Sequence, residues 1–169
     1  MPSDAPKIKI RKTQEYGAEV IFYERDEDNR EEIGFSIAME EGRKLIKPFD
    51  DLNVIYGQGT AALEVMDEVD TKFDMSVVCC SGGGLAAGTG IVLKNSLSDC
   101  QLYTAEPKDW NDHEKSFLQN NIVSIKTKKH GMCDALENPQ PGEITFRINS
   151  ALNTKGLSAN DKYIICLLY

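Results

Sequence analysis

The feature that most constrains this chain is an apolar run, residues 75–80, that leads directly into three consecutive glycines. Such a run is typical of a strand buried on both faces of a parallel sheet. Residues 85–97, which follow the glycines, have the composition of a helix. Ligands of parallel α/β sheets bind outside the carboxyl ends of the strands. The sequence therefore predicts a ligand-binding loop at the end of a buried strand.

Strand-like and helix-like segments alternate along most of the chain. The predicted strands are residues 19–23, 45–46, 75–80, 101–105 and 122–125. The predicted helices are residues 6–16, 29–41 with Asn29 or a nearby Asp as N-cap, 60–69, 85–97, 142–152 and 162–169. This repeated order predicts an α/β fold with a doubly wound, mostly parallel sheet and helices on both faces.

The loop itself consists of Ser81, Gly82, Gly83, Gly84 and Leu85. Glycines lack Cβ, so their backbone can approach an anion closely and turn N–H groups toward it. The helix that follows adds its positive N-terminal end, and the serine adds a hydroxyl. We expect a phosphate-binding loop here. The alternative is a tight glycine-rich turn that binds nothing.

Neither standard nucleotide motif matches this loop. A P-loop places its lysine directly after the last glycine, whereas Lys94 lies ten residues beyond Gly84. The Gly-x-Gly-x-x-Gly fingerprint of a nucleotide-binding Rossmann domain is also missing from its usual place at the first strand. We therefore rank a Rossmann nucleotide domain behind other readings of the alternation.

A second glycine cluster comprises Gly57, Gln58, Gly59 and Thr60. We expect it to precede the helix at residues 60–69. By itself, the cluster is equally compatible with a simple helix start in which Thr60 is the N-cap.

Acidic side chains follow the strand predicted at residues 101–105. Glu106 and Asp112 are six residues apart, and two carboxylates with an intervening backbone carbonyl can hold a hard divalent cation whose shell water completes. The alternative is that these carboxylates are solvated or cap a helix.

Charge and composition exclude several functions. A net charge of -8 and a pI near 4.8 disfavour nucleic-acid binding, and the basic residues 126–130 form only a short patch. No apolar run approaches the length of a membrane span. The five cysteines show no metal-ligand spacing with the two histidines, so we expect reduced thiols in a cytoplasmic protein and no zinc site.

Taken in order, these motifs resemble the serine/threonine dehydratase family of pyridoxal-phosphate enzymes. This fold type II group also contains serine racemase and the tryptophan synthase beta chain. The matching segments are residues 1–9, 16–20, 57–60, 81–85, 106–107 with 111–112, 133–135 and 141–146. The resemblance covers nearly the whole chain, and the joint order of the motifs makes it specific.

The resemblance implies roles for the residues already described. The N–H groups of residues 81–85 would bind the phosphate of pyridoxal 5'-phosphate. Glu106, Asp112 and the carbonyl of Trp110 would bind Mg²⁺ or Ca²⁺. The activity implied is elimination of water from serine, threonine or a related hydroxy amino acid, which gives a 2-oxo acid and ammonia. The family also suggests a homodimer.

Several family features have no counterpart in this sequence. The motif around the Schiff-base lysine and the Ser-Asn-His type loop for the substrate carboxylate are both missing, and none of Lys7, Lys9 and Lys12 is assigned that role. Asp134 and Ala135 replace the more common Asp-Gly. The final predicted helix is apolar up to Tyr169, so we expect residues 1–169 to be the central or C-terminal part of a longer domain, without its lysine-bearing part and its C-terminal end.

Two classes of function follow from this. The chain is either the central portion of a pyridoxal-phosphate dehydratase or a non-catalytic truncated remnant that binds an anion or the cofactor without activity. No catalytic residue is assigned within the chain in either case.

Overall fold

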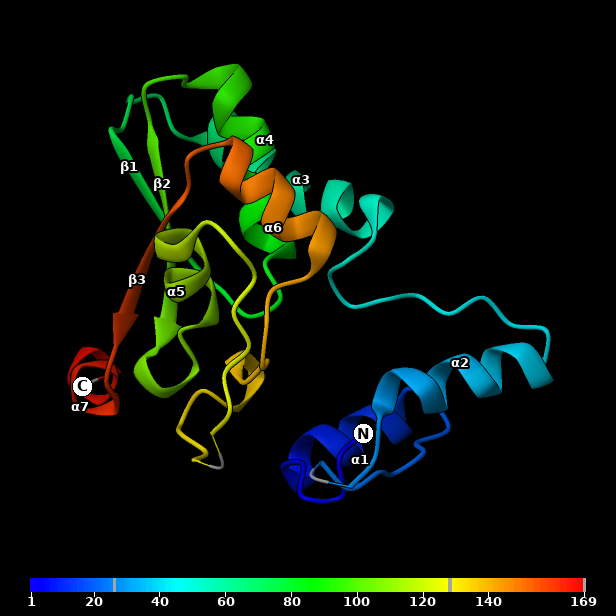
Figure 1. Cartoon of the computed structure of the whole chain (residues 1–169). Coiled ribbons are helices and arrows are strands. Elements are labelled where there is room, and N and C mark those ends of the chain that lie inside the picture. Colours follow the sequence, from blue (N-terminus) through cyan, green and yellow to red (C-terminus); the bar gives the residue numbers. More distant parts are fainter. Residues whose placement is uncertain (26, 128, 169) are drawn as a thin grey trace. The chain divides into compact units, whose positions relative to one another are not determined.

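The computed structural model describes residues 1–25, 27–127 and 129–168, and the chain divides into two compact units, Met1–Ile46 and Lys47–Tyr169 (Figure 1). The first unit contains α1 (Lys7–Glu15) and α2 (Arg30–Glu40). None of its described residues is fully buried. Asn29 caps α2 as predicted, because its side chain accepts hydrogen bonds from the N–H groups of Glu31 and Glu32 at 3.0 and 3.4 Å.

Two strands predicted for the first unit are wrong. Residues 19–23 form only an isolated parallel bridge, which joins Tyr23 to Pro2, and residues 45–46 are irregular. β-branched and aromatic composition favours extended backbone, but a strand also needs a partner along its length. Among the described residues of the first unit, the bridge between Pro2 and Tyr23 is the single strand-like pairing.

The second unit is built on a parallel sheet of β1 (Met75–Cys79), β2 (Gln101–Pro107) and β3 (Lys155–Ala159), in that order across the sheet. β1 and β2 confirm the predicted strands, whereas β3 was missed because its short, polar sequence has no strand pattern. The segment predicted as a strand at residues 122–125 is irregular, and the Ile125 N–H donates to the Pro139 carbonyl at 2.7 Å.

Five helices accompany this sheet. They are α3 (Leu52–Glu68), α4 (Gly84–Ser96), α5 (Asp112–Gln119), α6 (Glu143–Ala151) and α7 (Asp161–Leu168). Short 3₁₀ turns occur at Lys108–Trp110 and Asp134–Leu136. α5 was not anticipated from the sequence. The α/β class with a parallel sheet is confirmed.

The apolar composition of β1 predicted a strand buried on both faces, and this prediction is wrong. Met75 and Val77 are 58% and 50% exposed, while the alternate residues Ser76 and Val78 are half-buried. Their partners across the register, Leu102 and Thr104, are buried. The alternation places α4, α5 and α6 on one face of the sheet and leaves apolar side chains on the opposite face accessible in the described residues.

The second glycine cluster lies inside α3 and does not precede it, so the predicted helix start is wrong. α3 begins at Leu52, where Asp51 accepts hydrogen bonds from the N–H groups of Asn53 and Val54. The Thr60 hydroxyl donates to the Gly57 carbonyl one turn back at 2.7 Å.

Gly59 instead permits close contact between α3 and α4. A methyl group added at Gly59 would lie 3.0 Å from the Gly88 carbonyl oxygen, and one added at Gly88 would lie 2.5 Å from the Ile55 carbonyl oxygen. Backbone therefore packs against backbone where the two helices meet, and α4 is held rigidly against α3.

Alanine substitutions at two helical glycines test this packing. Gly88→Ala should lower the free energy of unfolding by about 1–3 kcal/mol, because the new methyl group overpacks the contact with α3. Gly57 is the matched control, since nothing lies within 4 Å of a methyl group there. Gly57→Ala should leave stability unchanged or raise it by about 1 kcal/mol through helix propensity. Denaturant unfolding measures both, and equal effects would contradict the packing argument.

Candidate functional site

The loop at residues 81–85 joins the carboxyl end of β1 to α4. Gly83 is the N-cap of α4 and has a left-handed backbone with φ of 91°, which favours glycine. Its carbonyl accepts the N–H of Ala87 at 2.9 Å and so begins the helix. The loop thus has the strand–glycine–helix geometry that the sequence predicts.

Side chains of α6 hold the carbonyl groups of this loop. The Thr145 hydroxyl donates to the Gly82 carbonyl at 2.6 Å, and the Asn149 side-chain amide donates to the Gly83 carbonyl at 3.2 Å. The Gly142 N–H adds a bond to the Gly82 carbonyl at 3.3 Å. Thr145 and Asn149 are fully buried. These contacts fix the orientation of the two glycine peptides.

The N–H groups of the loop remain available as a result. No backbone carbonyl within the described residues accepts the N–H of any residue from Ser81 to Ala86. These N–H groups belong to the loop and the first turn of α4, where the helix dipole is positive. The Gly83 N–H interacts with the sulfur of Cys80. The arrangement fits a phosphate group, because it offers N–H donors without carbonyl acceptors and has no charged side chain of its own.

Each of the three glycines is also required by its neighbours. A methyl group at Gly82 would overlap the Phe49 ring, and one at Gly83 would lie 2.5 Å from Cε1 of His113. A methyl group at Gly84 would lie 3.0 Å from Oε1 of Gln58. A side chain at Gly82 or Gly83 would therefore overlap its neighbours, and one at Gly84 would be tightly packed.

The segment before α3 ties this region together. Asp50 Oδ1 accepts hydrogen bonds from the N–H groups of Ile144 and Thr145, at 2.8 and 3.2 Å, and so satisfies the first turn of α6. Sequence reasoning missed Asp50, Thr145 and Asn149. Their contacts join residues far apart in the chain, and no local pattern marks them.

Glu106 and Asp112 lie together, as their spacing suggested, with Glu106 near the end of β2 and Asp112 at the start of α5. The Glu106 carboxylate accepts the N–H of His113 at 2.9 Å through Oε1 and the N–H of Glu114 at 2.8 Å through Oε2. It therefore caps α5 while being almost fully buried. The helix-capping alternative is thus correct for Glu106, and it leaves the second lone pair of each oxygen for another partner.

Asp112 is fully buried, and neither carboxylate oxygen has a hydrogen-bond partner within the described residues. Burial and, next, the nearby charge of Glu106 raise the pKa of Asp112 to about 8. Burial also raises the pKa of Glu106. Two buried carboxyl groups side by side thus hold protons more tightly than usual, and a cation bound between them would favour their ionised form.

Trp110 ends the 3₁₀ turn that connects β2 to this pair. Its side chain is buried, and its indole N–H donates to the Lys129 carbonyl at 2.8 Å. Within residues 1–25, 27–127 and 129–168, no three His, Cys, Asp or Glu side chains cluster as metal ligands. A cation here would have two carboxylates as side-chain ligands and would need a backbone carbonyl and water to complete its shell, which suits a hard cation. The metal role of Glu106, Trp110 and Asp112 stays a prediction.

The five cysteines form no disulfide, which agrees with the prediction of reduced thiols. Cys80 is buried beside the loop, and burial raises its pKa well above the ordinary value. Cys79, the last residue of β1, is exposed.

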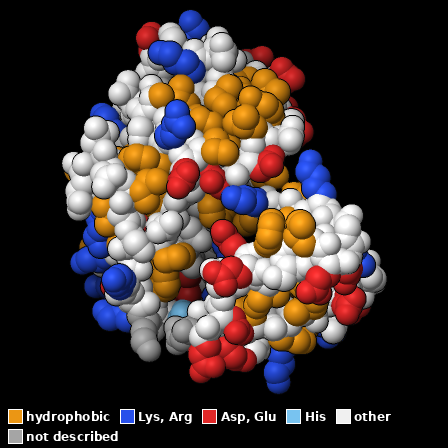
Figure 2. All heavy atoms as spheres, turned by 45° about the vertical axis from the view of Figure 1, so that its right-hand side comes forward, with side chains coloured by type: hydrophobic (Ala, Val, Ile, Leu, Met, Phe, Trp, Pro, Cys, Tyr) orange, Lys and Arg blue, Asp and Glu red, His pale blue; other side chains and the backbone are white. Residues whose placement is uncertain are grey.

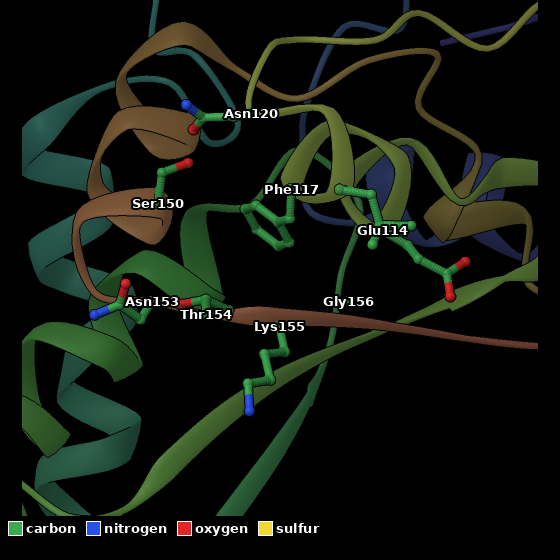
Figure 3. A pocket seen from close by; sticks show the side chains of 9 residues that line it. Glu114, Phe117, Asn120, Ser150, Asn153, Thr154, Lys155 and Gly156 are labelled. Carbon is green, nitrogen blue, oxygen red and sulfur yellow. The ribbon is translucent and has the colours of Figure 1, made fainter.

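A separate cavity of about 500 Å³ opens between the ends of α5 and α6 and the start of β3 (Figure 3). Phe117 faces its centre, and Ser150 points toward it from α6. The hydroxyls of Ser150 and Thr154 are buried without a partner within the described residues. The cavity is thus distinct from the loop. Phe117 lines it and also packs on His113, whose ring lies against Gly83 of the loop.

The raised pKa of Asp112 predicts a pH-dependent stability. Because the folded state holds this proton more tightly than the unfolded state, the ionised form is penalised, and the penalty grows as pH rises from about 4 toward about 8. With a chelator present, Asp112→Asn and the wild type should have the same free energy of unfolding at pH 4. At pH 8 the free energy of unfolding of Asp112→Asn should be higher by at least about 1.4 kcal/mol, the equivalent of one pKa unit.

Asp109→Asn is the matched control, since the Asp109 carboxylate is 55% exposed. It should change stability equally at both pH values. Denaturant melts at the two pH values give the comparison, and an Asp112→Asn gain that is independent of pH would contradict the assignment.

Comparison with known proteins adds to this geometry. The family profile described as "Pyridoxal-phosphate dependent enzyme" matches residues 1–168. The serine racemase of Schizosaccharomyces pombe is 37% identical over 170 residues, which cover 100% of this chain and 52% of that protein. The L-threo-3-hydroxyaspartate ammonia-lyase of Saccharomyces cerevisiae is 40% identical over 148 residues, which cover 88% of this chain and 45% of that protein.

A solved structure agrees with these sequence matches. Maize serine racemase superposes with a TM-score of 0.89 at 27% identity, and the match covers 98% of this chain and 49% of the maize chain. The chain thus spans about half the length of the relatives it matches. On the profile match and the shared fold, the chain belongs to the family of pyridoxal-phosphate-dependent enzymes.

Proposed function

We propose that this chain supplies the phosphate-binding part of a pyridoxal-phosphate-dependent lyase that eliminates water from a hydroxy amino acid. The products would be a 2-oxo acid and ammonia. The observation that carries the proposal is the loop at residues 81–85, whose carbonyls are held by Thr145 and Asn149 while its N–H groups lack carbonyl acceptors. The ammonia-lyase and serine racemase names of the relatives support an amino-acid substrate.

In this proposal the residues of the chain bind and orient the cofactor. The N–H groups of residues 81–85, with the positive end of α4, would hold the phosphate of pyridoxal 5'-phosphate. Ser81 adds a hydroxyl donor. When bound, the cofactor acts as an electron sink for the charge left by removal of a substrate proton. Thr145 and Asn149 fix the orientation of the loop peptides in the absence of the cofactor. Binding would therefore lose little free energy in ordering the N–H donors of the loop.

No lysine of the chain is assigned as the Schiff-base residue. Lys7, Lys9 and Lys12 belong to α1, and the ammonium group of Lys12 pairs with Glu15 at 2.7 Å. We propose that residues 1–169 correspond to the central or C-terminal part of the enzyme. The lysine-bearing part and the C-terminal end would then lie outside residues 1–169.

We further propose that the carboxylate pair holds Mg²⁺ or Ca²⁺. Within the described residues no donor group reaches either oxygen of Asp112, and Glu106, the neighbouring carboxyl group, retains acceptor capacity. The carbonyl of Trp110 would add a neutral oxygen ligand of the kind that these cations accept. The cation would remove the repulsion between the buried carboxylates and stabilise the start of α5.

The surface of the chain favours assembly with further polypeptide. Large apolar side chains are exposed on α3, including Tyr56 at 59% and Leu63 at 50%. Figure 2 shows apolar side chains gathered in patches between charged groups on one face of the molecule. Such patches mark contact surfaces, in keeping with a homodimer. The prediction of a cytoplasmic location stays a prediction, and in the described part of the chain no helix has the length and apolar composition to cross a membrane.

A non-catalytic role is the second candidate. The phosphate loop is complete in this chain, whereas no amine is assigned to bond the cofactor. A fragment with these properties would bind a phosphate ester or another anion without turnover. The two candidates agree on binding and differ on chemistry.

Binding of pyridoxine 5'-phosphate, which has no aldehyde, tests the loop without any lysine. Thr145→Val should weaken this binding about tenfold, because it removes a hydroxyl that positions the Gly82 peptide. Thr60→Val is the matched control, since the Thr60 hydroxyl bonds within its own helix. Calorimetry supplies the affinities. The loop assignment fails when the phosphate ester binds no more tightly than pyridoxine.

Complementation separates the two candidates. The chain is combined with the half of the Schizosaccharomyces pombe relative that it does not match, and ammonia release is followed with L-serine, L-threonine and L-threo-3-hydroxyaspartate. The lyase proposal expects sustained release by the assembled pair and none by the chain alone. An assembled pair without turnover would favour the non-catalytic role, and a borohydride-fixed adduct on the isolated chain would contradict the missing amine.

A further inference from the structure

We infer that His113 is a positioning residue that couples the carboxylate pair to the phosphate loop, so that a cation at one site and a phosphate ester at the other strengthen each other's binding. The inference rests on the proposed function, because it needs both ligands to bind. Neither the carboxylate pair nor the loop requires the ring of His113 as a ligand, so its proposed role is to link the two sites.

His113 contacts both sites directly. Its backbone N–H donates to Oε1 of Glu106 at 2.9 Å. Its ring lies against Gly83, where an added methyl group would be 2.5 Å from Cε1 and 2.8 Å from Nε2. A displacement of the first turn of α5 therefore moves the ring against the peptide that begins α4. No other described residue that we have discussed bridges the two sites in this way.

The ring acts through its position. His113 is fully buried, and no hydrogen bond of normal geometry to the described residues reaches either ring nitrogen. The ring can therefore follow α5 without breaking such hydrogen bonds.

The ring is supported from behind by an aromatic stack. His113 packs on Phe117 with ring centroids 5.5 Å apart, and Phe117 stacks on Phe146 of α6 at 6.0 Å. α6 also carries Thr145 and Asn149, which hold the loop carbonyls. The loop thus lies between α6 and the ring of His113, and Phe117 connects that ring to Phe146 of α6. The cavity beside Phe117 in Figure 3 gives this stack room to shift.

The expected direction of coupling follows from the position of Glu106. Its carboxylate accepts the N–H groups of His113 and Glu114 at 2.9 and 2.8 Å. A cation bound by Glu106 and Asp112 would fix this carboxylate in its charged form, and charged acceptors make stronger hydrogen bonds. The first turn of α5 is then fixed, the ring of His113 is held against Gly83, and the loop is more completely ordered before phosphate binds.

Paired titrations of the whole chain test the coupling. Pyridoxine 5'-phosphate is titrated by calorimetry with and without saturating Mg²⁺, and Mg²⁺ is titrated by the fluorescence of Trp110, the single tryptophan. We expect Mg²⁺ to tighten binding of the phosphate ester about fivefold or more, and the ester to tighten Mg²⁺ binding by the same factor, since coupling is reciprocal.

Substitutions of His113 assign the coupling to its ring. His113→Ala should still bind each ligand but reduce the coupling factor to about 1, because the link between the sites is removed. His113→Phe restores a ring without nitrogens and should restore most of the factor. Ser150→Ala, which alters the cavity but touches neither site, is the control and should keep the wild-type factor. Circular dichroism and melting confirm that each variant folds, and Phe117→Leu replaces His113→Ala if the latter does not.

Each outcome bears on a different claim. If the wild type binds both ligands with a factor of 1, the inference is overturned and the proposed function stands. If His113→Ala, or Phe117→Leu in its place, keeps the full factor, the coupling does not pass through the ring of His113 and the inference is overturned. If the phosphate ester does not bind the wild type at all, the proposed function fails and takes the inference with it.

Discussion

The carbonyl groups of Gly82 and Gly83 are hydrogen bonded to Thr145 and Asn149, and these bonds decide which way the loop presents its donors. A glycine-rich loop is otherwise free to turn its peptides in either direction. Packing by Phe49, His113 and α6 removes that freedom. A loop ordered in advance binds a phosphate at lower entropic cost, so the affinity expected here depends on buried side chains remote in sequence.

The parallel pairing of β1 with β2 brings the loop and the carboxylates to one edge of the sheet. Cys79, the last residue of β1, lies opposite Ala105 in the register, and Glu106 is the next residue of β2. The loop that follows β1 therefore lies beside the end of β2. α5 then begins at the carboxylates and turns the ring of His113 back beneath the loop. Two sites about 25 residues apart in the chain thus become neighbours, as the alternation of strands and helices anticipates.

Local signals predicted the elements that local interactions stabilise. β1, β2, α4 and the Asn29 cap follow from apolar runs, glycines and a side-chain acceptor within a few residues. The predicted start of α3 is wrong because Gly57 and Gly59 were interpreted as residues that precede a helix. Gly59 lies inside α3 and contacts Gly88 of α4, and no pattern within α3 reveals this contact. β3 and the roles of Thr145, Asn149 and His113 depend on long-range partners. The loop was therefore predictable, whereas the contacts that shape it were not.

Unsatisfied buried polar atoms concentrate around this part of the fold. Both oxygens of Asp112, both ring nitrogens of His113 and Oδ1 of Asn149 lack partners within the described residues. Each such atom costs about 1–3 kcal/mol relative to a bonded one. A fold that only required stability would replace these side chains with apolar ones of similar size. Their concentration beside a loop whose N–H groups lack carbonyl acceptors within the described residues is in keeping with the proposed ligand sites, since ligands would supply the missing partners or fix the groups that border them.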